Sequence, residues 1–70
     1  MTELSISAQT GPAGVPELDI RGEVDLGNAA RLRREIARAF HKGARSLRLK
    51  VAGLAFIDST GLSVLLDAVK

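Results

Sequence analysis

Apolar and polar residues alternate in two short segments near the start of the chain. Every second residue is apolar in residues 3–9, and a similar alternation resumes in residues 15–21. An alternation of period two is typical of strands that bury one face. Between the two segments, residues 10–14 contain the glycines and the proline that favour a turn. The pattern predicts a β-hairpin.

In residues 29–42 the apolar spacing changes to steps of three and four, which predicts a helix. The short amide of Asn28 can accept hydrogen bonds from first-turn N–H groups, and Gly43 is a typical C-terminal stop. The helix is expected to bury one apolar stripe, formed by Ala29, Leu32, Ile36, Ala39 and Phe40.

A third strand is expected over residues 46–51, where the alternation returns. It would turn Leu47, Leu49 and Val51 to one face of the sheet. A compact apolar run, residues 54–57, follows after a short break and ends at an aspartate.

A second helix is predicted from Thr60 to the end of the chain. Its expected inward stripe consists of Leu62, Leu65, Leu66 and Val69. Val64 and Ala68 lie off this stripe, so the helix is apolar over more than one face. Either another part of the protein or a partner must cover the second face.

These elements predict an α/β fold, a β-hairpin followed by βαβ-α, with helices packed on a small mixed sheet. The strand–helix–strand unit should be parallel with a right-handed crossover. Residues 1–70 are interpreted as one domain that lacks later strands and helices, because no strand follows the second helix. The third strand would then be an open edge, and such an edge can pair two copies into a homodimer.

Composition narrows the class of protein. The chain is 46% hydrophobic with two prolines and seven glycines, which argues against a disordered or low-complexity chain. Without cysteine there can be no disulfide framework and no cysteine-ligated zinc. The first residues do not resemble a signal peptide, and no apolar run is long enough for a membrane helix. The net charge of +2 is too small to indicate a nucleic-acid partner.

The residues between the third strand and the second helix carry the most chemistry. Asp58 or Ser59 can cap the helix, and Gly61 allows another surface to approach the backbone. A phosphate on Ser59 would meet the positive end of the helix and would add negative charge beside Asp58. Ordinary capping and a functional hydroxyl are both compatible with this spacing.

A second polar cluster follows the second strand. If the crossover is parallel, the loop that carries Glu23 and Asp25 lies at the same sheet end as Asp58, where open α/β sheets place their sites. Asp25 could orient a hydroxyl or bind a partner. These three carboxylates specify a Mg²⁺ site only weakly, so loop carboxylates near a helix start are the simpler interpretation.

Enzymatic motifs are missing from the sequence. It contains no phosphate-binding loop with Lys-Ser/Thr and no Gly-x-Ser-x-Gly elbow. The single histidine, His41, is expected at the far end of its helix from Ser59, which argues against a catalytic triad. The sequence therefore predicts a protein that is not an enzyme and that binds no cofactor and no metal.

The first predicted helix also carries a basic stripe, which consists of Arg31, Arg34, Arg38 and Lys42. Glu35 interrupts the stripe, and no aromatic residue is available to stack on a nucleotide. A solvated helix face is the preferred interpretation, and an acidic protein partner is the alternative.

Residues 56–62, Phe-Ile-Asp-Ser-Thr-Gly-Leu, resemble the STAS domain of bacterial anti-sigma factor antagonists. Residues 22–25, Gly-Glu-Val-Asp, are similar to the loop that precedes the first helix in that family, and the spacing between the two motifs is also similar. Two positions depart from the family pattern: Lys50 replaces a frequent Asp or Asn, and Ser63 replaces a frequent Gly. Family domains are also longer and continue through further strands and helices.

The resemblance implies a cytoplasmic regulator of transcription that works by partner switching. The unmodified domain would bind an anti-sigma factor with GHKL-type serine kinase activity and so release the sigma factor. Phosphorylation of Ser59 would end this binding, and a metal-dependent serine phosphatase of the PPM type would restore it. The implied partner-binding residues are Gly22, Glu23, Asp25, Asp58, Ser59, Thr60, Gly61 and Leu62. Neither nucleic acid nor membrane is an expected partner.

Two other interpretations keep the fold but drop the switch. Some STAS domains are phosphorylation-independent modules of transporters or stress-sensing complexes. The chain could also be a truncated remnant without a function of its own.

Overall fold

The computed structural model describes residues 3–41 and 43–68. Predictions for Lys42, Val69 and Lys70 lie outside these ranges, as does any statement on the side chain of His41. The elements along the chain are β1 (Ser5–Thr10), a short 3₁₀ turn η1 (Pro12–Gly14), β2 (Pro16–Val24), α1 (Ala29–His41), β3 (Arg48–Ile57) and α2 (Ser59–Ala68).

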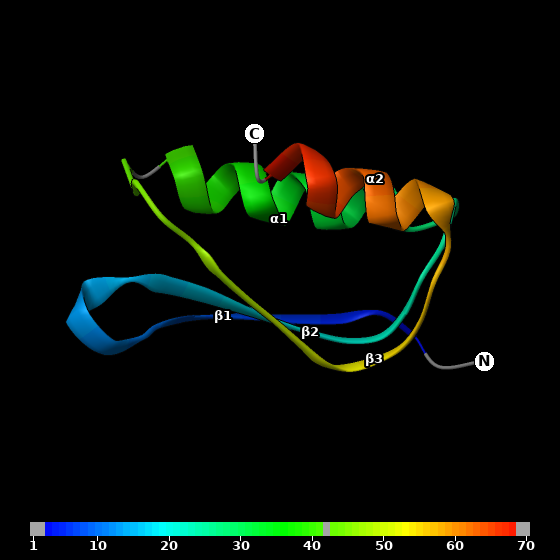
Figure 1. The fold of residues 1–70 in the computed structure, drawn as a ribbon, viewed down its shortest axis with the longest axis horizontal. Coiled ribbons are helices and arrows are strands. Elements are labelled where there is room, and N and C mark those ends of the chain that lie inside the picture. The colour runs from blue at the N-terminus through cyan, green and yellow to red at the C-terminus, as the bar shows by residue number, and fades with distance from the viewer. Residues whose placement is uncertain (1–2, 42, 69–70) are drawn as a thin grey trace.

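The three strands form one mixed sheet in the order β1-β2-β3. β1 runs antiparallel to β2, and β3 runs parallel to β2, so the predicted hairpin and the predicted parallel pairing across α1 are both confirmed. Figure 1 shows both helices on the same face of this sheet. β3 is an edge strand of the described sheet, also as predicted.

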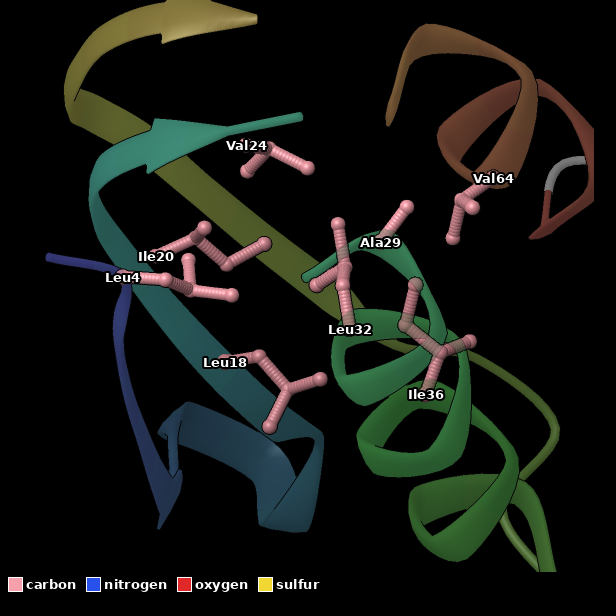
Figure 2. Close-up of a cluster of buried hydrophobic side chains, with 8 residues drawn as sticks. All are labelled: Leu4, Leu18, Ile20, Val24, Ala29, Leu32, Ile36 and Val64. Atoms are coloured by element: carbon pink, nitrogen blue, oxygen red, sulfur yellow. The ribbon is translucent and has the colours of Figure 1, made fainter. Parts of the chain in front are cut away.

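The core lies between the central strand β2 and the two helices. Ile6 pairs with Ile20 and Ala8 with Leu18, so the even-numbered side chains of both strands share the helix face. Figure 2 shows β2, α1 and α2 converging on this core. The eight buried hydrophobic residues are Leu4, Leu18, Ile20, Val24, Ala29, Leu32, Ile36 and Val64.

β3 is a single strand rather than the strand and separate apolar run that its sequence suggested. Relative to β2 it has extra residues at two places, first at Val51 and Ala52, opposite Ile20, and then at Ala55. Each irregularity changes which residues face the helices. Leu47 and Leu49 pack against the core, but Val51, expected on the same face, is 44% exposed and does not join them.

The predicted inward stripe of α2 is right at Leu65, which packs against the core, and wrong at Leu62 and Leu66, which are 49% and 56% exposed. Val64 and Ala68, expected off the stripe, are the residues that pack inward beside Leu65. The cause lies at Gly61, where a Cβ atom would stand 2.6 Å from Val24 Cγ1 and 2.8 Å from Ile57 Cγ1. This close approach turns the Gly61–Val64 side of α2 inward and leaves two leucines outside.

The opposite face of the sheet is polar around the buried carboxylate of Glu17. Gln9 Nε2 donates to Glu17 Oε1 over 2.8 Å, and Arg48 Nη1 donates to Glu17 Oε2 over 2.8 Å. These bonds join all three strands across the sheet. The Gln9 hydrogen bond, followed by the bond and charge of Arg48, holds the pKa of Glu17 below its ordinary value.

Candidate functional site

The two polar clusters of the sequence lie together at one end of the sheet. Val24 and Ile57, the last residues of β2 and β3, pair in register, and the Asp58 N–H donates to Val24 O over 3.1 Å. In Figure 1 both strands end at the side of the molecule where α2 begins. The predicted proximity of the loop after β2 to Asp58 is therefore confirmed.

Asp58 caps α2, which settles the alternative between Asp58 and Ser59. Asp58 Oδ1 accepts a hydrogen bond of 3.0 Å from the Gly61 N–H, and the backbone Asp58 O accepts one of 2.9 Å from the Leu62 N–H. An N-cap carboxylate accepts a hydrogen bond from a first-turn N–H group, and its negative charge interacts favourably with the positive end of the helix dipole. Ser59 is therefore not needed for the cap.

The second carboxylate oxygen of Asp58 reaches across to the loop after β2. Asp58 Oδ2 accepts a hydrogen bond of 3.1 Å from the Leu26 N–H, 32 residues earlier in the chain. One side chain thus holds both the start of α2 and the loop before α1. The sequence motif did not predict this connection, because it depends on the parallel pairing of β2 and β3.

The loop before α1 is held by its own side chains. Asp25 Oδ1 accepts from the Gly27 N–H over 2.9 Å. Asn28 Oδ1 accepts from the Asp25 N–H, and Asn28 Nδ2 donates to Glu23 O, both over 2.9 Å. The prediction that the Asn28 amide caps α1 is therefore wrong, since both its atoms bond backward to the loop. The turn chemistry of Asp and Asn was the sequence signal for this role.

Ser59 is exposed at the first position of α2. Within the described ranges, no hydrogen bond involves its hydroxyl group. An exposed hydroxyl beside the N-terminal N–H groups of a helix is accessible to another protein, and a phosphate on it would lie near the positive helix end. The structure therefore leaves the Ser59 hydroxyl available for modification.

The other predicted site residues divide into exposed and buried positions. Leu62 is exposed, and Glu23, Asp25 and Thr60 are half-buried. Gly22 and Gly61 are buried. Because glycine has no side chain, these two residues affect the site only through the course of the backbone. Gly22 has a φ of 95°, a left-handed conformation that glycine adopts without steric cost. The approach at Gly61 is made by Val24 and Ile57 of the chain itself.

Within residues 3–41 and 43–68, Asp25 and Asp58 form no ion pair with a basic side chain. Ion pairs elsewhere in these ranges are Arg21–Asp19, Arg33–Asp67, Arg38–Glu35 and Arg48–Glu17. Asp25 and Asp58 instead accept backbone N–H bonds. Residues 3–41 and 43–68 contain no group of three acidic or histidine side chains that could hold a metal ion.

Comparison with known proteins identifies the family. The model of the STAS domain matches residues 8–70. The chain belongs to the STAS domain family. Comparison with curated protein sequences finds no match. Neither helix in the described part of this STAS domain is long and apolar enough to cross a membrane.

Two solved structures share the fold at low sequence identity. An anti-sigma factor antagonist from Mycobacterium paratuberculosis superposes with a TM-score of 0.87 at 21% identity over 96% of this chain. The anti-sigma factor antagonist SpoIIAA in its unphosphorylated form superposes with a TM-score of 0.73 at 20% identity over 93% of this chain. The STAS chain described here spans 56% and 60% of those two chains.

Proposed function

We propose that this STAS domain is an anti-sigma factor antagonist that acts by partner switching. Unmodified, it binds an anti-sigma factor with GHKL-type serine kinase activity and so frees a sigma factor. Phosphorylation of Ser59 ends the binding, and a PPM-type serine phosphatase resets it. Family membership and the fold shared with two anti-sigma factor antagonists support this proposal.

The observation that carries the proposal is the exposed Ser59 hydroxyl at the start of α2. Asp58 supplies the helix cap, so modification of Ser59 does not remove the hydrogen bond from the Gly61 N–H to Asp58. The domain can therefore keep its fold while its surface changes.

The charge of the site explains how a phosphate would release a partner. Asp25 and Asp58 place two carboxylates at this end of the sheet, and within residues 3–41 and 43–68 neither forms an ion pair with a basic side chain. A phosphoserine adds about −1.5 to −2 charges at neutral pH. Repulsion and the cost of removing this charge from water both oppose docking of the surface that bound the neutral serine.

The basic stripe of α1 supports a protein partner rather than a nucleic acid. Arg31 Nη1 donates to Leu4 O over 2.7 Å, which ties α1 to the start of the chain. Arg38 pairs with Glu35 at 3.3 Å. Glu35 therefore neutralises part of the stripe, and the bond of Arg31 fixes that side chain on the protein itself. We place the protein in the cytoplasm, without a membrane partner, a cofactor or a catalytic activity of its own.

Intact mass after incubation with ATP and the anti-sigma kinase encoded nearest the gene tests the switch. We expect the wild-type domain to gain one phosphate and Ser59→Ala to gain none. Ser63→Ala is the matched control, since Ser63 is an exposed serine of the same helix. This control should be phosphorylated like the wild type. An unmodified wild type, or a phosphate retained by Ser59→Ala, would contradict the proposal.

A binding measurement in the same system separates the switch from a passive module. Ser59→Ala should stay bound to the kinase in the presence of ATP, and Ser59→Asp should bind poorly. Equal affinity of the two variants would favour a phosphorylation-independent STAS module.

A further inference from the structure

Leu26 is the most exposed of the large hydrophobic residues in the described part of the chain. Its relative exposure is 79%, and it stands in the loop between β2 and α1. A single exposed leucine is common on protein surfaces. Leu26 is distinguished by its position, because its N–H is bonded to the residue that precedes Ser59.

The backbone that presents Leu26 is held in place. Its own N–H is bonded to Asp58 Oδ2, and the next N–H, that of Gly27, is bonded to Asp25 Oδ1. The Asn28 side chain closes the loop through bonds to Asp25 N and Glu23 O. A side chain on an ordered loop binds a partner with little further loss of backbone entropy.

Asp58 holds a second exposed leucine in the same way. Its backbone oxygen accepts the N–H of Leu62, while its side chain accepts the N–H of Leu26. Leu62 and Leu66 follow Ser59 at positions i+3 and i+7, so all three share one face of α2. Leu26, whose backbone is bonded to the residue before Ser59, and Leu62 and Leu66, which follow Ser59 on its face of α2, are here called the leucine patch.

The charges at this end of the sheet indicate what the leucine patch would bind. Asp25 and Asp58 border it and form no ion pair within residues 3–41 and 43–68. A partner with arginine or lysine side chains around an apolar pocket would complement both features. A second copy of this domain would bring two further carboxylates to the same place.

We infer that the leucine patch is the apolar part of the surface that binds the anti-sigma factor, with Leu26 as its main anchor. The occupant is a protein surface with an apolar pocket rimmed by basic side chains. This inference rests on the proposed function and adds two leucines to its mechanism, because Leu26 and Leu66 are absent from the partner-binding residues predicted by sequence and Leu62 is among them. A phosphate on Ser59 would place a dianion within an apolar contact, where it loses hydration.

Affinity measurements with Leu26→Ser test the anchor. The probes are the purified anti-sigma kinases encoded in the source genome, each with ADP so that Ser59 stays unmodified. Burial of one leucine side chain is worth about 1.5–3 kcal/mol, so we expect Kd to rise about 10- to 100-fold. Leu26→Met should retain most of the affinity. The control is Val51→Ser, which changes an exposed apolar residue of β3 and should bind like the wild type.

The outcomes distinguish this inference from the proposed function. If one kinase binds the wild type and Leu26→Ser binds equally well, the leucine patch is overturned and the switch stands. If none of the kinases binds the wild type, both proposals fail. Thermal unfolding should show the same Tm for Leu26→Ser and the wild type, because the substituted side chain is exposed and its backbone bond remains.

Salt dependence tests the chemistry of the partner. Attraction between Asp25, Asp58 and basic groups should weaken as the salt concentration rises from about 0.05 to 0.5 M. We expect a Kd several-fold higher at high salt for the wild type, and a smaller change for Asp25→Asn. An affinity independent of salt would overturn the basic rim.

Discussion

The two helices of this STAS domain pack on the same sheet, yet their orientations are determined in different ways. α1 contains several arginines and a glutamate, and these polar residues leave one apolar stripe. Its Ala29, Leu32 and Ile36 are buried, as their spacing predicts, whereas Phe40 at the end of the expected stripe is 37% exposed. α2 has a single charged residue among its ten, Asp67, so apolar residues surround most of its axis.

The comparison shows that polarity orients α1, whereas steric fit orients α2. When a helix is apolar on several sides, burying any of these sides stabilises the fold by a similar amount. The position of the smallest residue then determines which side faces the sheet, because the helix backbone can approach most closely there. Gly61 lies against Val24 and Ile57, and the leucines on the other side of α2 remain exposed.

The largest expected effect is the difference in stability between truncating a leucine of α1 and truncating a leucine of α2. Leu32 of α1 is fully buried, so Leu32→Ala should lower the free energy of unfolding by about 2–5 kcal/mol. Leu66→Ala should change it by less than about 0.5 kcal/mol, as is usual for exposed positions. Urea denaturation measures both. A similar loss for the two variants would mean that α2 buries the stripe its sequence suggested.

A smaller effect is expected at the contact that orients α2. In Gly61→Ala the added methyl group would press against Val24 and Ile57. Overpacking costs about 1–3 kcal/mol, and the better helix propensity of alanine returns about 1 kcal/mol, so a net loss of up to about 2 kcal/mol is expected. Ser63→Ala is the control on the exposed side of α2. A Gly61→Ala variant more stable than the wild type would refute the steric explanation.

The smallest effect is expected on the sheet face away from both helices. The pKa of Glu17 is lowered in the folded state, mainly by Gln9 and then by Arg48. A lowered pKa stabilises the fold above the unfolded value, and this stability is lost as the pH falls through the folded value. Below the ordinary glutamate pKa of about 4.3, the wild type should therefore lose more stability than Glu17→Gln.

Urea midpoints between pH 7 and pH 3 measure this difference. Other carboxylates titrate in both proteins, so the comparison isolates Glu17. Parallel pH profiles for the two proteins would contradict the assignment. Because Glu17 faces away from the helices, Glu17→Gln should not alter the packing of α1 or α2.

The candidate site was predictable in part. The parallel crossover follows from the order of the elements, and it places Asp25 near Asp58 and Ser59. The hydrogen bonds within the site could not be predicted from the order of the elements. Asn28 resembles a helix cap in sequence, but the folded loop offers its amide two partners closer to the turn, Asp25 N and Glu23 O. Leu26 has no signal in sequence, since nothing local shows that its side chain remains exposed.

The sequence alone determined the hairpin, the helix α1 and the order of the elements along the chain, because each depends on residues close together in the chain. The tertiary structure decided the irregular pairing of β3, the orientation of α2 and the bond from Leu26 to Asp58. Each of these depends on atoms far apart in sequence, whose distances are set only when β2 and β3 pair and α2 packs on their ends.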